Sequence, residues 1–220
     1  MSSYTKNQAT QQTTTPGRRT VLATSPLARW RTNDLVTAAL LAVATGVVFW
    51  TWNFAYGVLE PAFTAVAAPF TALLGGTWFL AGVLGGLVVR RPGAALFCEI
   101  LAATVSAILG NQWGWTTVIS GLVQGLGAEL ILAVFLYRRF GLPVAALAGA
   151  FAGVGGALYE WTTWLQGYNV EFKLVYMGCY ALSGALIAGL GGWLITRALA
   201  RAGALNALPP GREALDQRAE

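Results

Sequence analysis

Three carboxylic acids lie within long apolar stretches of the sequence: Glu99, Glu129 and Glu160. Burying an ionisable side chain in hydrocarbon costs free energy, so such residues usually face the interior of a helix bundle and serve a function. A carboxylate beside aromatic planes suits a flat cationic or amino-bearing ligand, and Glu160 stands close to Trp161 and Trp164. Neighbouring carboxylates can instead relay protons. The three glutamates could therefore serve ligand recognition or proton transfer.

Several common chemistries are missing from the sequence. There is no histidine, and the two cysteines, Cys98 and Cys179, both lie in apolar stretches, so we expect no metal site. The chain has neither a Gly-x-x-x-x-Gly-Lys-Ser/Thr loop for ATP phosphates nor a Gly-x-Ser-x-Gly turn for a nucleophilic serine. We therefore expect a binding or transport protein that is not an enzyme and has no cofactor of its own.

The composition predicts a membrane protein. Of the 220 residues, 56% are hydrophobic and 10% are charged, and the mean hydropathy is +0.59. Soluble domains usually carry about 25% charged residues. Positions 35–196 hold only ten charged residues, and their arginines form two pairs, Arg90-Arg91 and Arg138-Arg139. The net charge of +5 does not indicate nucleic-acid binding, because no basic face with interleaved aromatic residues lies outside the apolar stretches.

The arginines also predict the topology, because Lys and Arg accumulate on the cytoplasmic side of membrane proteins. Keeping every arginine cluster inside requires one crossing out and one crossing back between successive clusters. Six spans of about 20 residues fit this pattern, with both termini in the cytoplasm. The predicted fold is therefore an all-α polytopic membrane protein, a bundle of six transmembrane helices. The predicted spans are about 34–56, 70–89, 93–109, 116–137, 143–164 and 172–196.

The remaining segments are predicted to lie outside the spans. Residues 1–28 are rich in Thr, Ser and Gln and predict a disordered cytoplasmic tail. Residues 29–202 form the membrane domain, and residues 203–220 predict a second loose cytoplasmic tail. Residues 57–68 are predicted to form an outer loop, because the arginine pattern allows only one crossing between 57 and 89.

Polar and aromatic residues gather at the predicted outer ends of the spans. An interfacial aromatic belt would place tryptophan at both faces, whereas a binding site explains the bias toward one face. Gly149, Gly153, Gly156 and Glu160 recur at steps of four, three and four, so this helix face is expected to pack closely below and to bind ligand above. The candidate ligand-binding residues are Glu160, Trp161, Trp164, Trp52, Asn53, Asn111, Trp113, Tyr168 and Asn169.

The other two carboxylates are predicted to lie deeper. Counting about 1.5 Å per residue places both Glu99 and Glu129 roughly 17 to 20 Å below the outer surface. Their spans are antiparallel neighbours, so the two side chains are expected to approach each other. Such a pair could be a proton-sharing structural contact or part of a proton relay.

A stripe of small residues occurs on the first span, where Ala38, Ala42 and Gly46 are spaced four apart. The stripe could pack within the chain, or it could be a docking surface for another membrane protein.

These features together resemble the substrate-binding S components of energy-coupling factor (ECF) vitamin transporters. Within that group the chain is most similar to the YkoE family, which is linked to thiamine and its hydroxymethylpyrimidine precursor. The resemblance rests on the stretch NDLVTAALLAVATGVVFW with its Ala-x-x-x-Ala motif, the NQWGW loop and the segment GALYEWTTW. It covers about residues 30–200.

The resemblance implies capture of the vitamin outside a prokaryotic cell by a multi-pass protein of the plasma membrane. A membrane coupling (T) protein and two ATPase subunits would power uptake, and Ala38, Ala42 and Gly46 would meet the coupling protein. The aminopyrimidine would stack on tryptophan and donate to a carboxylate, with Glu160 the first choice. The alternative is a stand-alone carrier or channel in which Glu99 and Glu129 relay protons.

Overall fold

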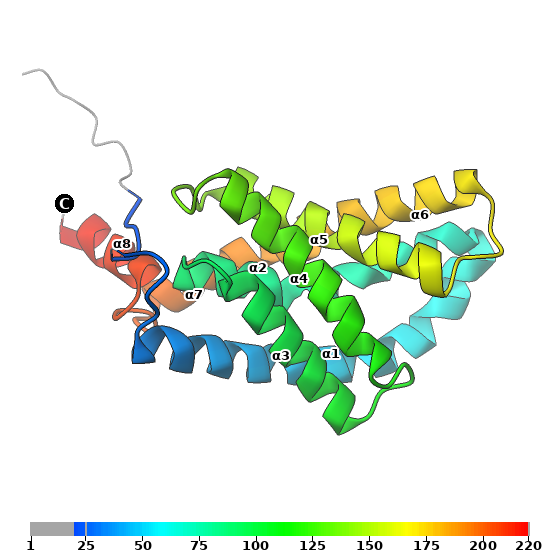
Figure 1. Cartoon of the computed structure of the whole chain (residues 1–220), viewed down its shortest axis with the longest axis horizontal. Coiled ribbons are helices and arrows are strands. Elements are labelled where there is room, and N and C mark those ends of the chain that lie inside the picture. The colour runs from blue at the N-terminus through cyan, green and yellow to red at the C-terminus, as the bar shows by residue number, and fades with distance from the viewer. Residues whose placement is uncertain (1–19, 25, 220) are drawn as a thin grey trace, which may run out of the picture.

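The computed structural model describes residues 20–24 and 26–219, and in this part of the chain all regular secondary structure is helical. The helices form one elongated bundle (Figure 1). The elements in order are α1 (Thr32–Val66), η1 (Ala68–Phe79), α2 (Leu80–Val89), α3 (Ala94–Leu109), α4 (Thr116–Val134), α5 (Leu142–Thr163), α6 (Val170–Ser183), η2 (Gly184–Gly191), α7 (Gly192–Arg201) and α8 (Pro209–Ala219).

Several of these elements run into one another and form longer helical segments. Five segments of the described chain are long and apolar enough to cross a membrane. Helix α3 is also apolar but has 16 residues. The five candidate spans are Thr32–Val66, Ala68–Val89, Thr116–Val134, Leu142–Thr163 and Val170–Arg201.

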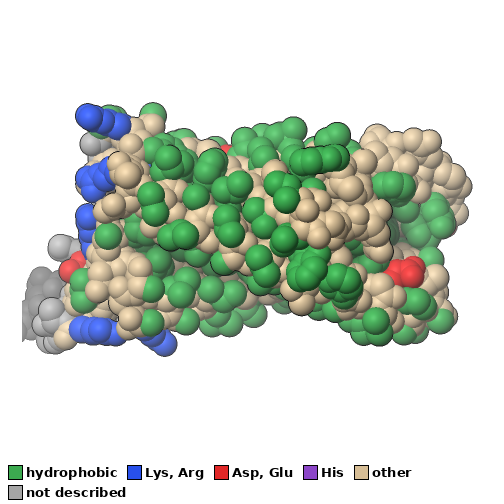
Figure 2. Space-filling model, turned by 90° about the horizontal axis from the view of Figure 1, so that it is seen from below, with side chains coloured by type: hydrophobic (Ala, Val, Ile, Leu, Met, Phe, Trp, Pro, Cys, Tyr) green, Lys and Arg blue, Asp and Glu red, His purple; other side chains and the backbone are tan. Residues whose placement is uncertain are grey.

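The two ends of the bundle differ in charge. Lys and Arg side chains gather at one end of the face drawn in Figure 2, while the long flank is largely hydrophobic. This end, which we call the arginine end, holds α8 and the start of α1 (Figure 1). The far end of α1 and the start of α6 lie at the opposite end (Figure 1). Exposed apolar side chains such as Leu40 and Leu130 suit a flank that faces lipid.

Close helix contacts depend on glycines, as predicted for α5. A Cβ atom added at Gly149 would lie 2.1 Å from the carbonyl oxygen of Gly184, and one added at Gly153 would lie 2.4 Å from that of Tyr180. Neither contact is possible for a residue with a side chain, so α5 can approach α6 and η2 this closely only with glycine. The prediction that this face packs closely is confirmed, and the packing brings Tyr180 next to Glu160.

The predicted outer loop over residues 57–68 is wrong. Helix α1 continues without a break through Pro61 to Val66, and η1 begins at Ala68. The arginine pattern counts membrane crossings, but it does not limit how far a helix extends beyond the membrane. Glu60 and Thr64 share one face of this extension, and the Thr64 hydroxyl donates a hydrogen bond of 2.7 Å to Glu60 Oε1.

The predicted loose tail over residues 203–220 is also wrong. Leu205 and Leu208 are buried against Ala38 and Ala42, and α8 follows them. Glu213 on α8 forms an ion pair with Arg90, with Nη1–Oε1 and Nη2–Oε2 distances of 2.6 and 3.0 Å. A buried guanidinium needs a partner, and this requirement holds the C-terminal segment against the bundle.

The described end of the predicted N-terminal tail is fixed in the same way. Residues 1–19 and 25 of that tail lie outside the described residues. The Val21 carbonyl accepts a hydrogen bond of 2.6 Å from Arg90, and the carbonyls of Thr24 and Leu27 accept hydrogen bonds from Arg91. Arg91 also forms a buried ion pair with Asp34. The arginine pair therefore anchors the described segment before α1 as well as α8.

The small-residue stripe of α1 packs inside the chain. Ala38 and Ala42 are fully buried, and the Cys98 thiol donates to the Ala38 carbonyl over 3.5 Å. A Cβ atom added at Gly46 would lie 2.7 Å from the Cβ of Val105 on α3. The stripe thus behaves as an internal packing face, and in this arrangement a partner protein could not touch the two alanine side chains.

Candidate functional site

A cavity of about 360 Å³ lies at the end of the bundle opposite the arginine end. Its walls come from α1, η1 and α3 to α6, together with the loop before α6. Ten aromatic residues and three glutamates line it, and no Lys or Arg is among the described residues that do so. The lining is therefore aromatic and acidic, and it favours a flat ligand that is cationic or rich in N–H donors.

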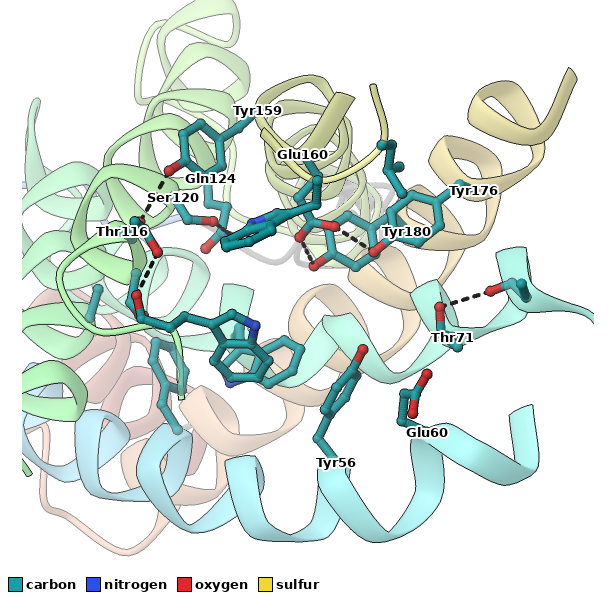
Figure 3. Close-up of a pocket in the computed structure, with 18 of the residues that line it drawn as sticks. Tyr56, Glu60, Thr71, Thr116, Ser120, Gln124, Tyr159, Glu160, Tyr176 and Tyr180 are labelled. Carbon is teal, nitrogen blue, oxygen red and sulfur yellow. Dashed lines mark hydrogen bonds between the residues drawn. The ribbon is translucent and has the colours of Figure 1, made fainter. Parts of the chain in front are cut away.

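Glu160 is held in place by two tyrosines of α6. Its Oε1 accepts a hydrogen bond of 2.7 Å from the Tyr180 hydroxyl, and its Oε2 accepts one of 2.5 Å from the Tyr176 hydroxyl (Figure 3). Phe79 packs edge-on against Tyr180, with ring centroids 5.0 Å apart. Because both carboxylate oxygens already have a donor, Glu160 and the tyrosines form one rigid polar unit on the cavity wall.

Glu99 is the second acidic group of the cavity and is almost fully buried, with 1% of its surface exposed. Its Oε2 accepts a hydrogen bond of 2.5 Å from the backbone N–H of Gly82. Its Oε1 is buried and has no hydrogen-bond partner among the described residues. A buried acceptor without a donor is costly, so a ligand donor that reached this atom would remove a standing penalty.

A third side of the cavity is an aromatic cluster. The rings of Tyr56, Trp78 and Trp113 contact one another, with centroids 5.1 to 5.6 Å apart. The Trp78 indole N–H donates to Asn53 Oδ1 over 3.0 Å, and Asn53 Nδ2 donates to the Ser106 hydroxyl over 3.3 Å. The cluster therefore has a fixed geometry and offers ring faces and edges to a planar ligand.

Comparison with known proteins identifies the family. Residues 33–155 match the family model described as "ABC-type cobalt transport system, permease component". The "Putative HMP/thiamine permease protein YkoE" of Bacillus subtilis (strain 168) is 32% identical over 190 residues, which cover 86% of this chain and 94% of that protein. A solved structure, "Crystal structure of an S-component of ECF transporter", matches with a TM-score of 0.81 and 31% identity, covering 87% of this chain and 96% of that one.

The chain belongs to the YkoE family of ECF-transporter S components. This YkoE-family S component is a membrane transport protein and not an enzyme. No group of three or more His, Cys, Asp or Glu side chains that could hold a metal ion occurs in residues 20–24 and 26–219.

The sequence predicted part of the lining of the aromatic cavity in this YkoE-family protein. Four of the nine candidate ligand-binding residues line it: Glu160, Trp113, Trp164 and Tyr168. Glu99, noted as a buried carboxylate of open role, lines it as well. Glu160, Trp113, Trp164 and Tyr168 come from the predicted outer ends of spans or the loops beside them, whereas Glu99 lies deeper on α3.

The other five candidates lie outside the lining and act as supports. Trp52 donates its indole N–H to the Leu74 carbonyl over 2.9 Å, and Asn53 holds Trp78. Asn111 Oδ1 accepts from the backbone N–H of Trp113 over 2.9 Å. Asn169 caps α6 by accepting from the Phe172 N–H over 2.8 Å, and Trp161 packs against the core.

Sequence reasoning missed most of the polar lining. Glu60, Tyr56, Tyr176, Tyr180 and Gln124 line the cavity but were not among the candidates. Their spacing carried a signal, because Tyr56 and Glu60, Tyr176 and Tyr180, and Ser120 and Gln124 are pairs four residues apart on one helix face. Gln124 donates to the Ser120 hydroxyl over 2.7 Å, so the pair forms one polar patch.

Glu99 and Glu129, which were predicted to approach each other, accept hydrogen bonds from different partners. Glu129 is not among the cavity residues; it caps the start of α3, where its carboxylate accepts from the backbone N–H groups of Gly93, Ala95 and Leu96 over 2.7, 2.9 and 3.2 Å. The positive end of a helix attracts a carboxylate, and counting residues along a span does not include this effect. The Tyr137 hydroxyl donates to Glu129 over 2.6 Å, and burial, followed by this bond, raises the pKa of Tyr137.

Proposed function

We propose that this S component captures thiamine or its hydroxymethylpyrimidine precursor in the aromatic cavity, for uptake powered by a membrane coupling (T) protein and two ATPase subunits. The observation that carries the proposal is the lining: ten aromatic side chains and three glutamates around about 360 Å³. An aminopyrimidine is flat and carries N–H donors, and the thiazolium ring of thiamine is a cation. Both suit aromatic faces and carboxylates.

The orientation of the membrane domain follows from the arginines. Six spans with both termini in the cytoplasm would put the arginine end inside and open the cavity to the outside. In this orientation α3 adds a further span to the five longer segments and is the third of six in chain order, and its 16 residues rise about 24 Å. The protein would then bind its ligand from the outer side of the plasma membrane of a prokaryote.

The two buried carboxylates of the cavity are proposed to have different roles. Glu160 already accepts two tyrosine hydroxyls, so it supplies negative charge and orients Tyr176 and Tyr180 toward the ligand. Glu99 Oε1 has no donor among the described residues. In the proposed complex this oxygen accepts a hydrogen bond from the amino group of the pyrimidine. Trp113 and Trp164 offer ring faces for stacking.

The stand-alone proton-coupled carrier is the second candidate, and it has less support. A relay through Glu99 and Glu129 needs the two carboxylates to exchange protons along one path. Glu129 accepts four hydrogen bonds at the start of α3, and Glu99 is bound to Gly82. No observation favours the relay over a ligand-binding role.

Ligand binding by the purified protein tests the proposal. Thiamine and hydroxymethylpyrimidine are each titrated while tryptophan fluorescence is followed, because Trp78, Trp113 and Trp164 line the cavity. Saturable quenching by at least one of the two compounds is expected, and Glu160→Gln should weaken it. If neither compound quenches fluorescence or raises the melting temperature, the assigned substrate is wrong. Uptake into liposomes by this chain alone would support the carrier instead.

A further inference from the structure

The aromatic cavity has an acidic group at each end. Glu99 lies at its inner end, on α3, and Glu60 lies at its outer end, on the extension of α1. The substrate-binding role proposed above uses Glu99 and Glu160 but gives no part to Glu60. The outer end of the cavity therefore has no ligand group assigned to it.

Glu60 and Glu99 are far apart along the bundle. Asn53 on α1 donates a hydrogen bond to Ser106 on α3, so these two residues mark one level on helices that both run away from the arginine end (Figure 1). Glu60 follows Asn53 by seven residues, and Glu99 precedes Ser106 by seven. At about 1.5 Å per residue the two glutamate backbones are roughly 20 Å apart along the bundle. A single pyrimidine ring cannot reach both carboxylates, whereas a ligand of two linked rings can.

The negative charge of Glu60 is not neutralised by any cation of the described chain. Its Oε1 accepts a hydrogen bond of 2.7 Å from the Thr64 hydroxyl, which is a neutral donor. Its Oε2 accepts no hydrogen bond from a described residue, and Glu60 takes part in no ion pair of the described chain. The side chain is half-buried at the cavity wall, so a ligand cation there would meet a carboxylate that is partly shielded from water.

Aromatic side chains surround the outer end of the cavity. Tyr56 lies one turn before Glu60 on the same face of α1, and both side chains point into the cavity (Figure 3). Across from them, at the start of α6, the rings of Tyr168 and Phe172 are stacked with centroids 4.1 Å apart, and both line the cavity. Aromatic faces attract cations. The outer end therefore combines ring faces with a free negative charge, and this chemistry suits a flat cation.

We propose that the outer end of the cavity is a cation subsite, in which Glu60 selects a ligand with a positively charged ring. The inference rests on the substrate-binding role proposed above and narrows its ligand. In thiamine the cationic thiazolium ring lies at the opposite end of the molecule from the pyrimidine amino group, so the ligand can meet Glu60 and Glu99 at once. Hydroxymethylpyrimidine is neutral and has no second ring. The cavity therefore prefers thiamine to its precursor.

The lining also predicts which form of the vitamin is rejected. The hydroxyethyl group of thiamine is attached to the thiazolium ring, so a phosphate on that group would lie at the outer end beside Glu60. The described lining contains no Lys or Arg that could offset the added negative charge. Because like charges in contact are strongly unfavourable, thiamine monophosphate is expected to bind at least about 10-fold more weakly than thiamine.

Calorimetric titrations of the purified protein test the subsite. The ligands are thiamine, hydroxymethylpyrimidine and a neutral deaza analogue of thiamine in which thiophene replaces the thiazolium ring. The wild-type protein is expected to bind thiamine about 10-fold or more tightly than either neutral compound. Glu60→Gln keeps an acceptor for Thr64 but removes the charge. It should weaken thiamine binding by about 3- to 10-fold and change the binding of the neutral compounds by less than about twofold.

A matched variant separates the subsite from the general charge of this end. Glu171 is exposed in the first turn of α6 and does not line the cavity. Glu171→Gln removes the same charge and should leave all three affinities unchanged. An equal loss of thiamine binding in Glu60→Gln and Glu171→Gln would reduce the effect to surface electrostatics and overturn the subsite. Equal weakening of thiamine and hydroxymethylpyrimidine in Glu60→Gln would also overturn it, because Glu60 would then not read the charge.

The wild-type titrations separate failure of the subsite from failure of the substrate assignment. Hydroxymethylpyrimidine that binds as tightly as thiamine would overturn the cation subsite and leave capture of the pyrimidine intact. Thiamine monophosphate that binds as tightly as thiamine would also overturn the subsite alone. If none of the ligands binds, the substrate assignment is wrong and the subsite is overturned with it.

Discussion

The Tyr180 hydroxyl donates a hydrogen bond of 2.7 Å to Glu160, although the two residues lie on different helices and 20 positions apart in the sequence. The contact exists because α6 meets α5 backbone to backbone at Gly153, and the Tyr180 ring lies over Gly156. A packing feature in the membrane interior thereby sets the geometry of a polar group in the cavity.

The glycine contact predicts a specific loss of stability. Gly153→Ala would place a Cβ atom 2.4 Å from the Tyr180 carbonyl oxygen, and the backbone must move to relieve the overlap. We expect a loss of about 1–3 kcal/mol, as for other overpacked sites, together with weaker ligand binding because Tyr180 shifts. Thermal unfolding and thiamine titration measure the two effects. Gly178→Ala on α6 is the control, since a Cβ atom there meets no atom within 4 Å. Equal Tm values for the two variants would contradict the argument.

Removing the tyrosine hydroxyl should weaken binding through Glu160. Tyr180→Phe leaves Glu160 Oε1 without its donor, so the carboxylate loses its fixed orientation. A lost hydrogen bond to a charged group is worth about 1.5–3 kcal/mol, which corresponds to a roughly 10- to 100-fold weaker Kd. Isothermal titration calorimetry with thiamine measures the change. Tyr159→Phe removes a cavity hydroxyl whose partner, the Thr116 carbonyl, is 3.5 Å away, and it should change the Kd far less.

A change at Glu99 should reverse the preference for a ligand functional group. In Glu99→Gln the amide oxygen is expected to accept from the Gly82 N–H, which turns the amide NH₂ toward the position of the free Oε1. A donor then replaces an acceptor. The variant should bind the 4-amino pyrimidine about 10-fold or more weakly and should prefer its 4-oxo analogue. Competition titrations with the two compounds measure the preference, and an unchanged ratio of affinities would remove Glu99 from the site.

A change at Glu129 should affect stability but not binding. Glu129→Gln keeps one acceptor oxygen and loses the charge that favours the start of α3, so we expect a loss of about 1–2 kcal/mol. The melting temperature should fall while the Kd for thiamine stays the same. A variant that melts normally but loses transport in the assembled transporter would restore the proton-relay alternative.

Local sequence features were sufficient where the physics is local. Hydrophobic stretches punctuated by arginines predicted a helical membrane protein and the separation of the two ends, because transfer into lipid depends on short segments of sequence. The four-three-four spacing from Gly149 to Glu160 predicted a close-packed face that ends in a polar group, because helical periodicity is fixed by backbone geometry.

Other features depend on partners that are distant in sequence. Arg90 and Arg91 served as topology markers, but both are buried, and their need for counter-charges holds Glu213 and Asp34 against the bundle. No local pattern in residues 203–220 shows that Glu213 will pair with an arginine 123 positions away. Glu129 and Glu99 have similar predicted depths in the membrane, so the sequence does not distinguish them. In the structure Glu129 accepts hydrogen bonds from N–H groups at the start of α3 and does not line the cavity.

The sequence by itself determined the membrane class, the charge asymmetry, the family resemblance and the helix face that carries Glu160. Each follows from the composition or spacing of residues close together in the chain. Only the tertiary structure decided which side chains meet around the cavity, because Tyr176, Tyr180, Glu60 and Glu99 come from three different helices. Helix crossing at glycines, and the pairing of buried charges with remote partners, are what bring such residues together.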